Sequence, residues 1–237
     1  MEVSRLLARD NAPHGTVITA DFQKAGRGRV RGRHWKMENG IDLAFTVLLR
    51  FTAIPPALTL RTGLALALAI EEFAPTLDGK ALIKWPNDIL LPVSRSDGKP
   101  EVLKTAGILT ESESGNVYIG IGVNLSKNQF QNAASVGLAA GLEYKAGDKF
   151  ILLEKILSYL RSEIEATDWR ERLEARLYKK GEQVCFAKGA ADSGDMVSGT
   201  LAGIGPDGEL LISPVDGTGI LSFTAGELLF PYARCSG

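Results

Sequence analysis

A basic, glycine-rich segment at residues 24–36 carries the most concentrated chemistry in the sequence. It reads Lys-Ala-Gly-Arg-Gly-Arg-Val-Arg-Gly-Arg-His-Trp-Lys and holds six of the 27 lysines and arginines of the chain, with no acidic residue among them. Arginine offers a fork of donors that matches phosphate oxygens, and glycine lets backbone N–H groups approach an anion closely. The segment therefore indicates an anion site, while the residues alone also allow a solvated basic loop.

A second motif, Lys84-Trp-Pro-Asn-Asp88, lies where two short apolar stretches at 81–85 and 89–91 meet. Asn followed by Asp favours a turn at the end of a strand. Lys84 and Asp88 could flank a nucleotide and its metal at that turn, or they could form a structural salt bridge. From these residues alone the structural interpretation is favoured.

Two further motifs place glycine inside strand patterns. Lys104 precedes Gly107 by three residues, and the run 120–124 reads Gly-Ile-Gly-Val-Asn. Because glycine weakens a strand, its presence indicates that a ligand or another backbone segment approaches closely. The run 120–124 is not the dinucleotide-binding fingerprint, since the third glycine and the following helix are missing. The two histidines, His14 and His34, show no spacing typical of metal ligands, so no metal held by the protein is expected.

The elements that must position these motifs follow from the hydrophobic pattern. Apolar, β-branched and aromatic runs predict strands at 16–22, 43–51 and 116–123. The Leu- and Ala-rich segment 58–73 predicts a helix that is apolar on nearly all sides and therefore buried. Apolar residues at helical spacing over 150–164 predict an amphipathic helix.

The pattern changes near residue 180. Asp168 and Glu171 resemble a capping box, which predicts a second helix that ends at Gly181. Turn signals then separate five short apolar runs and leave no room for a helix. We therefore place a domain boundary near residue 180 and expect a small β-barrel or sandwich at 181–237.

The composition excludes several classes of protein. A hydrophobic content of 45% and a net charge of −1 exclude a disordered chain. The longest uninterrupted apolar run, 64–70, is far shorter than the roughly 20 residues of a membrane-spanning helix. Early charged residues argue against a secretory signal, and two cysteines are too few for a disulfide framework, so we expect a cytoplasmic protein. The near-neutral charge disfavours generic nucleic-acid binding.

In this order and spacing, the four motifs resemble those of the biotin protein ligase (holocarboxylase synthetase) family. That family carries a Gly-Arg-Gly-Arg loop ending in Trp, then Lys-Trp-Pro-Asn-Asp, then Lys-x-x-Gly-Ile-Leu, then Gly-x-Gly-x-Asn. The resemblance implies an α+β fold: over 1–180, a mixed β-sheet with packed helices, like class II aminoacyl-tRNA synthetases. It also implies a small SH3-like β-barrel over 181–237. No DNA-binding domain precedes the motifs, so no DNA partner is expected.

The resemblance implies a two-step reaction. Biotin and Mg²⁺-ATP would give biotinyl-5′-adenylate and pyrophosphate, and a lysine of a biotin carboxyl-carrier domain would then take the biotinyl group as an amide. The residues that match the family's catalytic positions are Lys104, Arg27 and Arg29. The residues that match its substrate-binding positions are Gln23, Gly26, Arg33, Trp35, Lys84, Asn87, Asp88, Gly107, Gly120 and Asn124. No membrane partner is expected, and a homodimer is left open.

Three features depart from the family pattern. Val30-Arg31 occupies a single variable position of the loop, the family's Ser-Thr pair would fall before Met1, and the usual prolines after Asn124 are missing. These departures keep open a relative that acts on lipoate or another acid, or one that binds without turnover. A non-enzymatic RNA- or phosphate-binding module built on 24–36 is the third alternative, but it leaves the second and third motifs unexplained.

Overall fold

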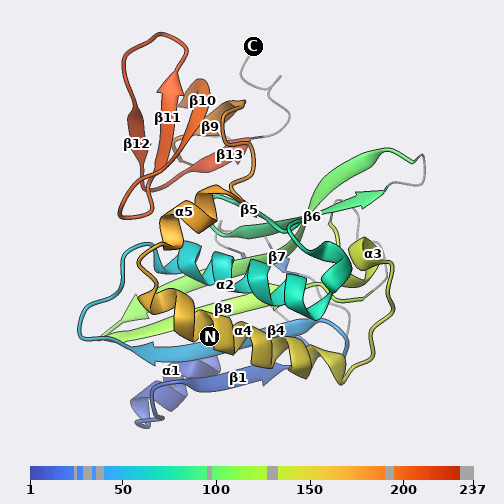
Figure 1. Cartoon of the computed structure of the whole chain (residues 1–237). Helices are drawn as coiled ribbons and strands as arrows, with labels where there is room; N and C mark the ends of the chain where they lie inside the picture. Colours follow the sequence, from blue (N-terminus) through green and yellow to red (C-terminus); the bar gives the residue numbers. More distant parts are fainter. Residues whose placement is uncertain are drawn as a thin grey trace.

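The computed structural model describes residues 1–23, 26–28, 34–35, 40–94, 98–126, 133–189 and 195–229, without the side chains of 27, 34 and 35. Figure 1 shows a six-stranded sheet with two long helices, α2 and α4, across one face, and a five-stranded sheet built from the C-terminal part of the chain. Among the described residues, no helix has the length and apolar character needed to cross a membrane.

The large sheet has the strand order β1-β4-β8-β7-β6-β5, and each of these pairings is antiparallel. Within the described residues, parallel pairing occurs only at the isolated bridges Ile83–Leu177 and Lys104–Ala133. The α+β class is confirmed. The large sheet was expected to be mixed, but all its ladders are antiparallel. Short turns join most of its successive strands, and such turns produce antiparallel neighbours. The strands are β1 (Thr16–Ala20), β4 (Leu43–Arg50), β5 (Leu82–Lys84), β6 (Asp88–Ser94), β7 (Pro100–Glu113) and β8 (Asn116–Val123), with β2 (Gly26–Arg27) and β3 (His34–Trp35) forming a separate pair.

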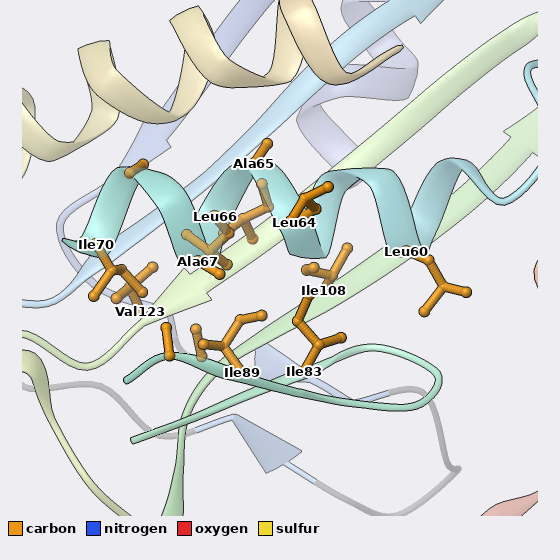
Figure 2. Packing of buried hydrophobic residues seen from close by; sticks show 14 of the residues in the cluster. Leu60, Leu64, Ala65, Leu66, Ala67, Ile70, Ile83, Ile89, Ile108 and Val123 are labelled. Carbon is orange, nitrogen blue, oxygen red and sulfur yellow. The ribbon is translucent and has the colours of Figure 1, made fainter. Parts of the chain in front are cut away.

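The helix expected at 58–73 is confirmed as α2, which is buried on almost every side between the sheet and α4. Gly63 allows this close packing, because a Cβ atom there would already lie 3.7 Å from Ile83 and Ile108. Figure 2 shows both isoleucines beneath α2, together with Ile89. The helices are α1 (Glu2–Arg9), α2 (Leu58–Phe73), α3 (Val136–Ala140), α4 (Asp148–Glu165) and α5 (Trp169–Glu174), with a 3₁₀ turn at Pro75–Leu77.

A buried arginine ties the helices together. Nη1 of Arg61, on α2, donates hydrogen bonds to the carbonyl oxygens of Glu163 and Ala166 at 2.8 and 2.7 Å. Its guanidinium also lies 4.8 Å from the centre of the Trp169 ring. Burial lowers the pKa of Arg61, although the charge of Glu163 opposes the effect. These contacts fix the end of α4 and the start of α5 against α2.

The second helix of the C-terminal half is shorter than expected. The capping pattern predicted a helix from Asp168 to Gly181, whereas α5 ends seven residues before that glycine. The following segment pairs with β5 instead: the N–H of Ile83 donates to the Arg176 carbonyl at 2.8 Å, and the N–H of Tyr178 donates to the Ile83 carbonyl at 2.9 Å. Pairing with the sheet thus overrides the local helix signal.

The five apolar runs after residue 180 form a sheet of order β12-β11-β10-β9-β13. Within the described part of the chain its end strands do not pair with each other, so the expected closed barrel is not found there. The strands are β9 (Gln183–Ala187), β10 (Met196–Ile204), β11 (Leu210–Pro214), β12 (Leu221–Phe223) and β13 (Glu227–Leu229).

The two sheets share one hydrophobic cluster, and Trp85 lies where they meet. Its indole N–H donates to the carbonyl of Gly208 at 3.0 Å, and its ring packs 5.9 Å from that of Phe186. Gly208 has a φ of +93° and sits so close to the start of α2 that a Cβ atom would lie 2.7 Å from Cβ of Ala57. The turn between β10 and β11 therefore needs glycine for both its conformation and its contact.

We expect Gly208→Ala to destabilise the protein more than Gly217→Ala. Both glycines have a positive φ, but a Cβ atom at Gly217 would meet nothing within 4 Å. Both variants therefore pay the cost of an alanine with positive φ. Only Gly208→Ala also brings its new methyl group into overlap with Ala57, and we expect this overlap to lower the free energy of unfolding by about 1–3 kcal/mol more. Urea denaturation of the two variants measures the difference. Equal losses would contradict the contact between this turn and α2.

Candidate functional site

A cavity of about 510 Å³ lies on the face of the large sheet opposite α2. Successive side chains of a strand point to opposite faces, so Ile108 of β7 packs toward α2 while Gly107 faces the cavity. Gly107 pairs with Gly122, which pairs with Ala44, which in turn pairs with Ala20. Because no side chain in this row is larger than a methyl group, the sheet is hollow here.

The next row of the sheet continues the floor. Gly120 on β8 pairs with Leu109 on β7 and with Thr46 on β4. A Cβ atom at Gly120 would lie 3.4 Å from the sulfur of Met1, which precedes α1. Gly120 therefore lies beneath the start of α1. The close approach that the sequence predicts at this glycine is made by the side chain of Met1.

Lys104 and Asp88, which come from two separate sequence motifs, form an ion pair at one side of this floor. Nζ of Lys104 lies 2.6 Å from Oδ1 of Asp88, with the two side chains 39% and 20% exposed. A Cβ atom at Gly107 would lie only 3.1 Å from the same Nζ atom. Gly107 thus leaves the space that the ammonium group occupies. Asp88 thus pairs with Lys104, and Lys84 is not among the described residues that line the cavity.

Asn87 both lines the cavity and fastens the turn that precedes Asp88. Its side-chain N–H donates to the carbonyl of Ile108 at 2.7 Å, and the N–H of Ile108 donates back to the Asn87 carbonyl at 2.9 Å. Trp85, two residues earlier, holds the same turn to the C-terminal sheet. The position of the Asp88 carboxylate is therefore fixed from both sides.

Asn124 lies behind Lys104 rather than in the cavity lining. Its side-chain N–H donates to the carbonyl of Ala134 at 3.0 Å, and the N–H of Ala134 donates to the Lys104 carbonyl at 2.8 Å. Oδ1 of Asn124 and the hydroxyl of Thr105 are buried and have no hydrogen-bond partner among the described residues.

The cavity lining includes two glycines of the basic segment and the glutamine just before it. These residues are Gln23, Gly26 and Gly28, and Gly26 pairs through its backbone with Trp35. For four expected site residues the structure describes only the backbone or nothing. Arg29 and Arg33 lie outside the described residues, as do the side chains of Arg27 and Trp35. The expected residues that the structure brings together around the cavity are Gln23, Gly26, Asn87, Lys104, Gly107 and Gly120.

A charged pair that no sequence motif indicates also lines the cavity. Nη2 of Arg5, on α1, lies 2.7 Å from Oε2 of Glu111 on β7, and Nε lies 3.1 Å from Oε2 of Glu113. The guanidinium also lies 5.3 Å from the centre of the Tyr118 ring. The hydrogen bond to Glu111 raises the pKa of Arg5, although partial burial opposes the effect. Strand alternation from Gly107 could have indicated Glu111, but no local signal points to Arg5.

Comparison with known proteins identifies the fold and the family. The biotin/lipoate A/B protein ligase family matches residues 4–128. The bifunctional ligase/repressor BirA of Bacillus subtilis is 40% identical over 154 residues, which cover 60% of this chain and 43% of that protein. The chain therefore spans less than half the length of this relative.

Two other proteins are similar over most of the chain. The biotin–[acetyl-CoA-carboxylase] ligase of Paracoccus denitrificans is 30% identical over 232 residues, covering 90% of this chain and 89% of that protein. The biotin protein ligase of Aquifex aeolicus, solved with biotin and ATP, has a TM-score of 0.75 at 25% identity and covers 95% of this chain and 92% of its own. With the match over residues 4–128, these similarities show that the chain belongs to the biotin/lipoate A/B protein ligase family.

Proposed function

We propose that this chain is an ATP-dependent biotin protein ligase. In the first step a carboxylate oxygen of biotin attacks the α-phosphorus of ATP, which releases pyrophosphate and leaves biotinyl-5′-adenylate. In the second step the amine of a lysine on a carboxyl-carrier domain attacks the acyl carbon, which releases AMP and forms an amide. The observation that carries the proposal is the Lys104 ammonium, held by Asp88 beside a cavity floored with glycine.

The position of Lys104 suits the first step. A carboxylate and a triphosphate repel each other, so their approach needs a fixed positive charge between them. Lys104 supplies that charge at the edge of the cavity, and Asp88 holds it in place from the neighbouring strand. Arg27 and Arg29 are assigned the same role on the basis of the family resemblance alone.

The remaining assignments follow the cavity. Gln23, Gly26, Gly107 and Gly120 would contact the acid, and Asn87 would line its path. Asn124 does not line the cavity, so its assignment to substrate binding rests on the resemblance alone. Arg33, Trp35 and Lys84 are assigned to substrate binding on the resemblance alone.

Magnesium would enter with the nucleotide. Among the described residues there is no group of three or more His, Cys, Asp or Glu side chains that could hold a metal ion, so the ion is assigned to the nucleotide phosphates on general grounds. Bound there, Mg²⁺ would neutralise charge on the phosphates. The proposal also keeps the division at 1–180 and 181–237, an SH3-like closure of the second part, a cytoplasmic location and a homodimer as expectations.

The first test is ATP–pyrophosphate exchange, run with biotin, lipoate, octanoate and no acid. Exchange that depends on biotin supports the proposal. Exchange with lipoate or octanoate alone would keep the chemistry and replace the substrate. Absence of exchange with every acid, from folded protein, would contradict adenylate formation.

Lys104→Ala should lower biotin-dependent exchange by roughly 10²–10³-fold, because a charge that stabilises the transition state is removed. Lys180→Ala is a matched control, since Lys180 is also 39% exposed and also pairs with a carboxylate, Glu174, at 2.6 Å. Both ion pairs are partly exposed, so both variants should keep nearly the full free energy of unfolding. Exchange that falls equally in the two variants would contradict the assignment of Lys104.

Gly107→Ala should lower exchange by roughly 10–100-fold, because the new methyl group would lie 3.1 Å from Nζ of Lys104 and displace the ammonium. Gly147→Ala provides the control, since a Cβ atom at Gly147 would meet nothing within 4 Å. The rate constant and the Michaelis constant for biotin are measured for both. A Gly107→Ala variant with unchanged constants would show that the position of Lys104 is not critical.

A further inference from the structure

The cavity has two polar ends that lie on the same face of one strand. The Lys104 ammonium sits against Gly107 at one end, and Glu111 lies four residues further along β7. Because residues two apart share a face, Gly107, Leu109 and Glu111 all face the cavity. The two ends are therefore separated by about 13 Å along the strand. An acid whose carboxylate meets Lys104 would extend along β7 toward Glu111.

The far end presents a donor and an acceptor side by side. Arg5 reaches from α1 to Glu111 at 2.7 Å, and both side chains line the cavity. They remain 29% and 35% exposed, so both are accessible to water. Between the two ends the lining includes Leu109, Ile18 and Gly120, and Met1 of the N-terminus packs beside Gly120.

This arrangement distinguishes acids by the chemistry of their far end. A carboxylate accepts from an N–H group and a guanidinium donates to a carbonyl, so the pair suits a ring in which N–H and C=O are neighbours. An alkyl tail in the same place would remove water from both charges and give no hydrogen bond in return. The cost of that desolvation would count against a wholly apolar acid.

We propose that the Arg5–Glu111 pair determines specificity for acids that end in a hydrogen-bonding ring, such as the cyclic urea of biotin. This inference rests on the proposed function. The pair contributes no charge to the adenylation step itself. It acts on the choice of acid, by favouring a polar ring over a saturated chain at the end of the cavity remote from Lys104.

Glu111→Gln and Glu113→Gln form a matched pair for the test. Both glutamates accept from Arg5, at 2.7 and 3.1 Å, but only Glu111 lines the cavity. Each change keeps the size of the side chain and removes one negative charge next to the same arginine. Thermal unfolding of both variants checks that they fold equally well.

The dissociation constants for biotin and octanoate are measured by titration calorimetry for the wild type and both variants, and exchange is measured alongside. We expect Glu111→Gln to reduce the preference for biotin over octanoate by roughly tenfold, the size of one charge-assisted hydrogen bond. Glu113→Gln should leave that preference unchanged within the error.

Three outcomes would overturn the inference: a preference unchanged by Glu111→Gln, an equal change in both variants, or a wild type that binds neither acid. The proposed function fails by a different result, the absence of exchange with any acid. A wild type that prefers biotin in calorimetry, loses that preference in Glu111→Gln and shows no exchange would support the specificity pair and contradict the ligase activity.

Discussion

The ion pair between Lys104 and Asp88 is the interaction on which the rest of the proposed site depends. A lysine side chain is a flexible carrier of a point charge, so it can stabilise a reacting group only where its surroundings hold it at one place. Three features hold it here: the Asp88 carboxylate at 2.6 Å, the missing side chain of Gly107, and a bulge in β7 that shifts the pairing between Ile89 and Leu90. Since the two charges come from neighbouring strands, the register of the sheet sets their separation.

The position of Asp88 depends in turn on packing far from the cavity. A partly exposed ion pair adds little to stability, so it cannot itself hold the turn that precedes Asp88. That turn is held by Asn87, which bonds to β7, and by Trp85, whose indole bonds to Gly208 in the C-terminal sheet. The C-terminal sheet thus contributes to the geometry of a charge pair that is formed by β6 and β7 of the large sheet. This is a structural reason for both sheets to share one hydrophobic cluster.

The sequence allowed the ingredients of the site to be named but not their assembly. Glycine within a strand pattern has few local explanations, which is why Gly107 could be assigned to a close approach from the sequence alone. The pairing of Asp88 with Lys104 could not be assigned, because it depends on a bulged register that local sequence does not encode. Arg5 and Glu111 are 106 residues apart, so no pattern relates them. The early end of α5 has the same cause, since pairing with β5 overrides local propensity.

The two faces of the large sheet show how such a site can be tolerated. On one face α2 packs tightly, with Gly63 bringing the helix within contact distance of Ile108. On the other, Gly107 and Gly122 leave the strands uncovered, which gives up apolar burial that larger side chains would provide. The stability of the sheet must therefore come mainly from the α2 face. Substitutions that fill the hollow face could stabilise the fold, and they would do so by removing the space in which an acid could lie. The small residues of this row are therefore explained by the cavity and not by the packing of the sheet.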